Sequence, residues 1–203
     1  MRPTHDLKAA IDAAAPGSTL TLCAGTWIVP RSLKIEKDLT LIGAGSDQSI
    51  LDGGNTTTVL HVNGDVTVKL ADLTVTRGKS PTTAGGLSNS GDLTLRNVAV
   101  TANKSESGGG LFRAGGKLRL AAGTRVSSNS AIGEFTLDGK GGGIRILQGS
   151  VILDAGSSVT NNHASGGGGG IYSNVQNAVT INPGSTVSGN TLDNCEPDIG
   201  AWM

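Results

Sequence analysis

Charged side chains gather in one segment of the sequence, from residue 134 to residue 145. Glu134 and Asp138 supply carboxylates there, and Lys140 and Arg145 supply cations. Carboxylates and cations on one loop can bind a sugar or a metal ion, and a loop that projects from a scaffold can form the wall of a groove. The segment is therefore the first candidate for a ligand site. The alternative is an insertion that the surface tolerates.

A second candidate is a run of cations without acids, over residues 109–129. It contains Arg113, Lys117, Arg119 and Arg125. On one coil of a repeat, these side chains would form a positive stripe that attracts an acidic polymer such as a uronate glycan. The alternative is a set of solvated charges that only keep the protein soluble.

Small hydroxyl side chains recur beside a series of valines and form a third candidate. A lattice of threonines on a flat sheet, with strands ~4.8 Å apart, is the surface that an ice-binding solenoid displays. Threonine is also a good strand former, so the pattern has a structural alternative. The hydroxyl candidates are Thr74, Thr76, Thr101, Ser127, Thr160, Thr186 and Ser188.

The composition argues against several classes of protein. Sixteen Lys and Arg balance sixteen Asp and Glu in 203 residues, whereas a nucleic-acid binder normally has a basic excess. No apolar run approaches the ~20 residues of a membrane span. Cys23 and Cys195 stand near opposite ends of the chain, so we expect neither a disulfide nor a metal site. We also expect no cofactor and a monomeric protein.

The elements that would position these candidates form a repeat. Four segments share a Gly-Gly-aliphatic start, short strands of alternating polarity and a Val-x-x-Asn end. Alternation without helical patterns predicts strands and argues against a βαβ fold. Repeats of this size suit the turns of a parallel β-helix. The second glycine of each start stands at Gly86, Gly110, Gly143 and Gly170, at intervals of 24, 33 and 27 residues.

We therefore predict an all-β fold, a single-stranded right-handed parallel β-helix with three sheets and seven or eight coils. Leu93, Leu95, Val98 and Val100 should point into its core. The whole chain, 1–203, would form one domain, and Thr4 or Asp6 would cap an N-terminal helix over 6–15. The boundaries expected are a cap at 1–17, coils over 18–190 with an insertion at 130–140, and a C-terminal cap at 191–203 that includes Pro197, Ile199 and Trp202.

The asparagine that ends each repeat has a structural interpretation. Asparagine tolerates the left-handed αL conformation and forms local hydrogen bonds through its amide. Stacked once per coil, such amides can also bond to one another along the axis. The ladder expected consists of Asn103, Asn129, Asn162 and Asn190.

The chain resembles the bacterial right-handed parallel β-helix repeat proteins of the pectate-lyase-like superfamily. The resemblance rests on the stretches Leu20–Trp27, Leu39–Gly45 and Ile50–Gly54, and the later blocks also resemble the repeats of polymorphic outer-membrane proteins. It implies three sheets, a helical cap and an extracellular or cell-surface location, although this sequence shows no signal peptide. It implies no single activity, because the family mixes lyases, hydrolases, epimerases and adhesins.

An enzyme of this family would need clustered catalytic groups. A hydrolase needs paired carboxylates, and the sequence has no Asp-Asp pair, Gly-His-Gly or Arg-Ile-Lys. The resemblance implies that a lyase would use carboxylates to hold Ca²⁺ and a Lys or Arg as base.

We therefore expect a non-enzymatic, secreted or cell-surface module that binds carbohydrate or a surface partner along one solenoid face. The alternatives are a polysaccharide lyase or hydrolase with its site near residues 134–145 and Arg113, an ice-binding protein, and a bare structural scaffold.

Overall fold

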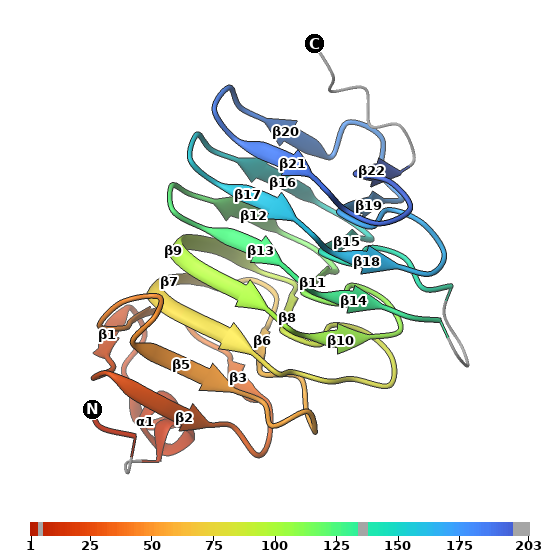
Figure 1. The fold of residues 1–203 in the computed structure, drawn as a ribbon. Helices are drawn as coiled ribbons and strands as arrows, with labels where there is room; N and C mark the ends of the chain where they lie inside the picture. Colours follow the sequence, from red (N-terminus) through yellow and green to blue (C-terminus); the bar gives the residue numbers. More distant parts are fainter. Residues whose placement is uncertain (4–5, 134–137, 197–203) are drawn as a thin grey trace.

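The computed structural model describes residues 1–3, 6–133 and 138–196. It shows an all-β parallel solenoid of about six turns with one short helix at the N-terminal end (Figure 1). The fold class expected from the repeat is confirmed. No helix in the described part of the chain has the length and apolarity to cross a membrane.

Each turn contributes strands to three faces, and all the pairings between turns are parallel. The first face consists of β1 (Ser18–Thr21), β4 (Leu39–Ile42), the first halves of β7 (Thr67–Thr76) and β9 (Asp92–Thr101), β12 (Lys117–Leu120), β16 (Ser150–Leu153) and β20 (Val179–Ile181). The second face consists of β2 (Gly25–Ile28), β5 (Ser49–Asp52), the second halves of β7 and β9, β13 (Arg125–Ser127), β17 (Ser158–Thr160) and β21 (Thr186–Ser188).

The third face follows the second along the chain. It consists of β3 (Leu33–Ile35), β6 (Leu60–Val62), β8 (Leu87–Asn89), β11 (Leu111–Arg113), β15 (Ile144–Ile146), β19 (Ile171–Ser173) and β22 (Cys195–Glu196). Three of the connections from the second to the third face carry a short sheet of β10 (Lys104–Ser105), β14 (Ser130–Ala131) and β18 (His163–Ala164).

The turn count is lower than the seven or eight coils expected. Upstream of the four repeats, the aliphatic residues Val68 and Val75 lie on two faces of one turn, because β7 runs without a break from the first face onto the second. The segments in β4 and β5 likewise lie on two faces of a single turn. The number of aliphatic segments therefore overestimates the number of coils, because one coil carries such segments on more than one face.

The core consists of stacked aliphatic side chains. Leu93, Leu95, Val98 and Val100 are at most 1% exposed, as expected from the alternation. Parallel register places equivalent residues above one another, so that Val100 pairs with Val126 in the next turn. Narrow coils filled by aliphatic columns leave little room for large rings, which explains the scarcity of aromatic residues.

The N-terminal helix α1 (Leu7–Ala13) is shorter than the 6–15 expected. Asp6 caps it, since its side chain accepts a hydrogen bond from the Ala9 backbone N–H at 3.0 Å, and Thr4 lies outside the described residues. Ala14 is extended, and the Lys37 ammonium donates to the Ala14 carbonyl at 3.0 Å. A residue before proline disfavours the helical conformation, which helps to end the helix ahead of Pro16.

Two expected boundaries are wrong. The insertion does not begin at residue 130, because β14 pairs in regular register with both β10 and β18, and the extra residues follow Ala131. The coils do not end at residue 190, because β22 extends the third face by pairing with β19. The rest of the expected C-terminal cap, with Pro197, Ile199 and Trp202, lies outside the described residues.

The four asparagines that end the repeats stack in the interior. Asn103 donates from Nδ2 to Oδ1 of Asn129 at 3.0 Å, and Asn162 donates in the same way to Asn190 at 3.0 Å. None of them adopts the αL conformation. The residue before each one does so instead, at Ala102, Ser128, Asn161 and Gly189. The amide thus serves the stack, and the turn falls one position earlier.

Candidate ligand-binding face

The register of the third face brings one outward side chain from each turn into a single row. Strands alternate inward and outward residues; the middle residue of each three-residue strand on this face points outward, and Glu196 of the two-residue strand β22 pairs with one of them. We call this set the outer row: Lys34, His61, Ser88, Phe112, Arg145, Tyr172 and Glu196. Neighbours along it are one strand spacing apart, ~4.8 Å.

The C-terminal half of the outer row combines aromatic rings with cations. The Arg145 guanidinium lies 4.5 Å from the centroid of the Tyr172 ring, and the Lys140 ammonium lies 4.7 Å from the same centroid. Both distances are in the range of cation–π attraction. Arg145 pairs with Phe112 in the preceding turn and with Tyr172 in the next, so the guanidinium stands in the row between two aromatic residues.

Asp138 completes this cluster from the inserted loop. Its carboxylate lies 2.8 Å from the Lys140 ammonium and 3.1 Å from the Arg145 guanidinium. Burial alone would raise the pKa of Asp138, but the hydrogen bonds from Lys140 and Arg145 outweigh it and hold the pKa below its ordinary value. Asp138 and Tyr172 in turn raise the pKa of Lys140. Both shifts favour the charged forms of Asp138 and Lys140 at neutral pH.

The N-terminal half of the outer row borders a shallow polar groove of about 440 Å³. Lys34, Glu36, His61 and Asn63 contribute charge and hydrogen-bonding groups to it. Burial, followed by the charge of Lys34, lowers the pKa of His61, and Glu36 opposes this effect. The remaining walls are hydroxyl side chains, from Ser32, Thr57, Thr58, Ser80, Thr82, Thr83 and Ser88.

The structure brings together most of the first candidate segment. Asp138, Lys140 and Arg145 meet as described above, and Glu134 lies outside the described residues. The aromatic residues Phe112 and Tyr172 were not among the candidates, and the register brings them to nearby places on the outer row. A single strand, β15, lies between them. The signal was present in the sequence, since both aromatics and Arg145 directly follow a Gly-Gly-aliphatic start.

The second candidate, a single cationic stripe, is wrong. Lys117 and Arg119 lie on the first face, Arg125 lies on the second face, and Arg113 points into the core with 0% exposure. The chain turns two corners between Arg113 and Arg125, so residues close in sequence point in different directions. Arg119 is also paired, because its Nε lies 2.6 Å from the Asp154 carboxylate.

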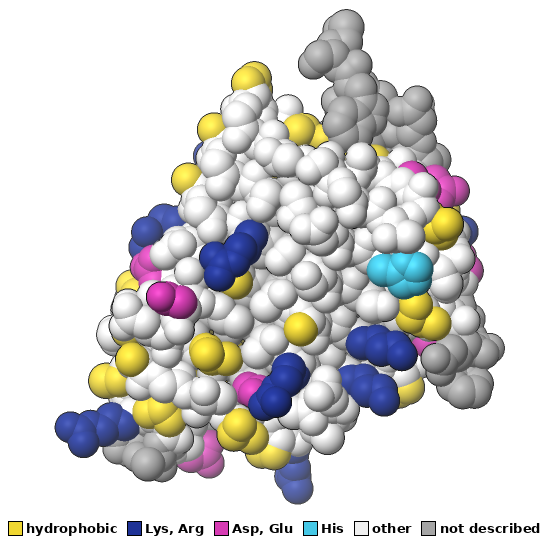
Figure 2. Space-filling model, in the orientation of Figure 1, with side chains coloured by type: hydrophobic (Ala, Val, Ile, Leu, Met, Phe, Trp, Pro, Cys, Tyr) yellow, Lys and Arg dark blue, Asp and Glu magenta, His cyan; other side chains and the backbone are white. Residues whose placement is uncertain are grey.

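The hydroxyl candidates separate into two rows on the second face. One row is continuous over five turns, with Thr76, Thr101, Ser127, Thr160 and Ser188 in register. The other row includes Ala99 and Arg125 between Thr74 and Thr186. Thr74 is 8% exposed and donates its hydroxyl to the Ser46 carbonyl. Figure 2 shows this face mostly free of charged side chains.

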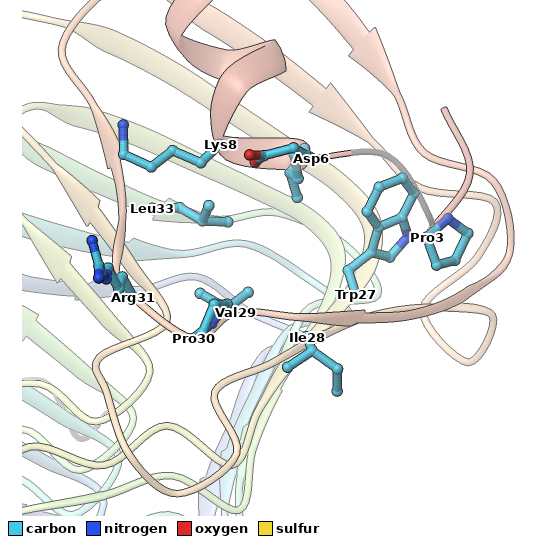
Figure 3. A pocket seen from close by; sticks show the side chains of 10 residues that line it. Pro3, Asp6, Lys8, Trp27, Ile28, Val29, Pro30, Arg31 and Leu33 are labelled. Atoms are coloured by element: carbon cyan, nitrogen blue, oxygen red, sulfur yellow. The ribbon is translucent and has the colours of Figure 1, made fainter.

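A separate pocket of about 380 Å³ lies at the N-terminal end, between α1 and the segment from β2 to β3. Trp27 and Pro3 stand on one side of it, and Lys8 and Arg31 stand on the other (Figure 3). Trp27 is 2% exposed and belongs to the hydrophobic core. The pocket lies at the boundary between the capping helix and the first coil.

The described residues contain no group of three or more His, Cys, Asp or Glu side chains that could hold a metal ion. Cys23 is an exposed thiol in the first turn, and Cys195 is partly buried in β22. No family model matches the sequence, and neither a curated protein nor a solved structure matches it.

Proposed function

We propose that the protein is a secreted or cell-surface module that binds an acidic polysaccharide along the outer row of the third face without cleaving it. One observation carries the proposal: Arg145 and Lys140 both lie against the Tyr172 ring while they hold a carboxylate, that of Asp138. An aromatic ring can stack on a sugar, and cations can bind the acidic substituent of that sugar.

The length of the face favours a polymer over a single sugar. From Lys34 to Tyr172 the outer row covers five strand spacings, ~24 Å at ~4.8 Å each. The polar groove at one end and the aromatic–cation cluster at the other border the same row. A chain of sugars lying along the solenoid axis could contact both.

The protonation states favour binding over catalysis. A general acid or base works best when its pKa lies near the working pH. Asp138 has a lowered pKa, so it is a poor proton donor, and Lys140 has a raised pKa, so it is a poor base. Arg113, which would belong to a catalytic site near residues 134–145, is buried away from the cluster.

The proposed location rests on the resemblance alone. The sequence resembles the pectate-lyase-like superfamily and the repeats of polymorphic outer-membrane proteins, and such proteins act outside the cytoplasm. The parallel solenoid is consistent with this resemblance.

Binding to a panel of polysaccharides tests the proposal, with polygalacturonate and dextran sulfate as acidic members and dextran as the neutral one. We expect the wild type to bind the acidic members and to lose affinity with added salt. Arg145→Gln should weaken binding about tenfold, which corresponds to about 1.4 kcal/mol. Arg119→Gln is the matched control, because it removes one arginine from the first face and should bind like the wild type.

The same panel, with and without Ca²⁺, separates binding from cleavage. The appearance of new chain ends would contradict the proposal and favour a lyase or hydrolase. In that case Asp138→Ala and Arg145→Ala should abolish turnover with the fold intact. Equal affinity of Arg145→Gln and the wild type would remove the third face as the binding surface.

A second candidate function, ice binding, rests on the continuous hydroxyl row of the second face. Five turns place a Thr or Ser at the same position, at the strand spacing of ~4.8 Å. The adjacent row is interrupted by Ala99 and Arg125, so only one of the two rows carries a hydroxyl side chain in every turn. Measurable thermal hysteresis that is lost in Thr160→Tyr would favour this function over glycan binding.

A further inference from the structure

The inward column of the third face contains three polar residues where the alternation predicts aliphatic ones, and two of them are neighbours. Each turn places the last residue of its third-face strand in this column. The order is Ile35, Val62, Asn89, Arg113, Ile146 and Ser173. Asn89 and Arg113 stand on neighbouring strands at paired positions, and both are 0% exposed.

The Arg113 guanidinium is only partly satisfied by the protein. Its Nε donates to the Ser150 carbonyl at 2.9 Å. Its two Nη atoms are buried and have no hydrogen-bond partner within the described ranges. Burial lowers the pKa of Arg113 to about 10, with an opposing contribution from the charge of Asp92. The group therefore remains positively charged at neutral pH, inside the solenoid.

The Asp92 carboxylate does not neutralise this charge by direct contact. It accepts a hydrogen bond from the Lys117 backbone N–H at 2.8 Å, and no ion pair joins it to Arg113 among the described residues. Both polar atoms of the Asn89 side chain are likewise buried without a hydrogen-bond partner there. Buried donors from two adjacent turns thus face the interior together.

The backbone around the guanidinium is shaped to accommodate it. Gly149 closes the turn beside Arg113 with φ +82°, and a Cβ at this position would overlap Nη2 of Arg113 and the Gly116 carbonyl. An L-residue would be strained at this φ as well. The turn therefore approaches as closely as it does because residue 149 has no side chain.

A buried cation without a counter-charge costs several kcal/mol, and unsatisfied donors add to this cost. Ordered water would satisfy the hydrogen bonds and leave the charge, whereas a small anion would satisfy both. We propose that the interior of the third face, at Arg113 and Asn89, binds a monovalent anion of the size of chloride. The site is separate from the outer row, which lies on the outside of the same strands.

Thermal unfolding of the whole chain tests the proposal, with sodium gluconate replaced stepwise by sodium chloride at constant ionic strength. A ligand that binds only the folded state raises the unfolding midpoint with its concentration. We expect the midpoint of the wild type to rise with chloride and that of Arg113→Met to be independent of it. Arg125→Met, which removes an exposed arginine of the second face, should keep the dependence.

A crystal grown in bromide provides the second measurement, and it decides the matter if Arg113→Met does not fold. We expect an anomalous peak within hydrogen-bond distance of the Arg113 Nη atoms. Three results would overturn the proposal. The unfolding midpoint of the wild type is independent of chloride, the midpoint of Arg113→Met still rises with chloride, or the density beside Arg113 shows no anomalous signal from bromide.

Discussion

Asn129 and Asn162 are joined by two hydrogen bonds to one oxygen. The Nδ2 and the backbone N–H of Asn129 both donate to Oδ1 of Asn162, each at 3.0 Å. Oδ1 of Asn129 accepts the corresponding pair from Asn103, at 3.0 and 3.1 Å. The Asn129 side chain thus connects three successive turns through hydrogen bonds to Asn103 and Asn162. Asn129 is 1% exposed, so these hydrogen bonds are shielded from water.

Asn129→Ala should therefore destabilise the fold severely. The change leaves the Asn103 backbone N–H without its acceptor, and it removes one of three acceptors of Asn103 Nδ2 and a donor to the Val100 carbonyl. Each such group costs about 1–3 kcal/mol, and partial relaxation should limit the total loss to about 3 kcal/mol. Urea unfolding measures this loss. The control is Asn63→Ala, at a partly exposed position, which should change stability by less than about 0.5 kcal/mol.

Ala102→Gly should stabilise the protein. Ala102 has φ +54°, and the left-handed conformation costs an L-residue about 1–2 kcal/mol. Part of that gain is lost because glycine makes the unfolded chain more flexible, so we expect a net gain of about 0.5–1 kcal/mol. Ala155→Gly, at an exposed turn position without positive φ, should lower stability instead. Equal effects of both changes in thermal unfolding would contradict the backbone argument.

The repeat made most of the fold predictable from the sequence. Alternation around Val98 and Val100 gave the inward positions, because a strand directs successive side chains to opposite faces. The orientation of Arg113 was not predicted, because its charge suggests a surface residue while its place in the strand is inward. The pairing of Asp138 with Arg145 was also not predictable, because the inserted loop follows no repeat.

Asp52 should make the stability of the protein sensitive to acid. Burial would raise the pKa of Asp52, but hydrogen bonds from the Arg77 side chain and the Gly54 backbone N–H lower it overall. A carboxyl with a lowered folded pKa stabilises the fold above its unfolded value of about 3.9, and this contribution is lost as the pH falls through the folded pKa.

Asp52→Asn should accordingly be less stable than the wild type at pH 7 and should lose less stability below pH ~4. Unfolding midpoints measured from pH 7 to pH 2.5 report the difference. If the unfolding midpoints of the variant and the wild type fell in parallel as the pH is lowered, Asp52 would not contribute to the loss of stability in acid. Asp12→Asn is a control, because its carboxylate pairs with Lys8 at an exposed position of α1.

His61 should make glycan binding stronger in mild acid. Burial and the charge of Lys34 lower the pKa of His61, with Glu36 opposing them, so the imidazole is neutral at pH 7. Protonation below pH ~6.5 adds a positive charge to the groove. In the free protein, stability should fall over the same window, because a His with a lowered folded pKa binds fewer protons than it does when unfolded.

Dextran sulfate is a suitable probe for this effect, because its charge does not change over the window. We expect its affinity to rise severalfold from pH 7 to pH 5 in the wild type and to change little in His61→Gln. His163→Gln removes an exposed histidine outside the outer row and should behave as the wild type. A flat profile in the wild type would exclude the N-terminal groove from the binding surface.

The capping helix α1 should keep the protein monomeric. Leu7 and Ile11 are buried against the first coil, and Lys37 ties the helix end to the solenoid through the Asp12 carbonyl at 2.7 Å. Without the helix, the apolar end of the solenoid is open to a second copy, and exposed sheet ends associate readily. Deletion of residues 1–16 should therefore produce aggregates in size-exclusion chromatography with light scattering.

A point substitution separates the covering role of α1 from a general loss of chain. Ile11→Asp places a charge at a position with 1% exposure, and desolvation of that charge should detach the helix. Ala13→Asp adds the same charge on an exposed position of α1 and should leave the protein monomeric. If the truncated chain stayed soluble and monomeric, the first coil would be stable with its end open, and α1 would have another role.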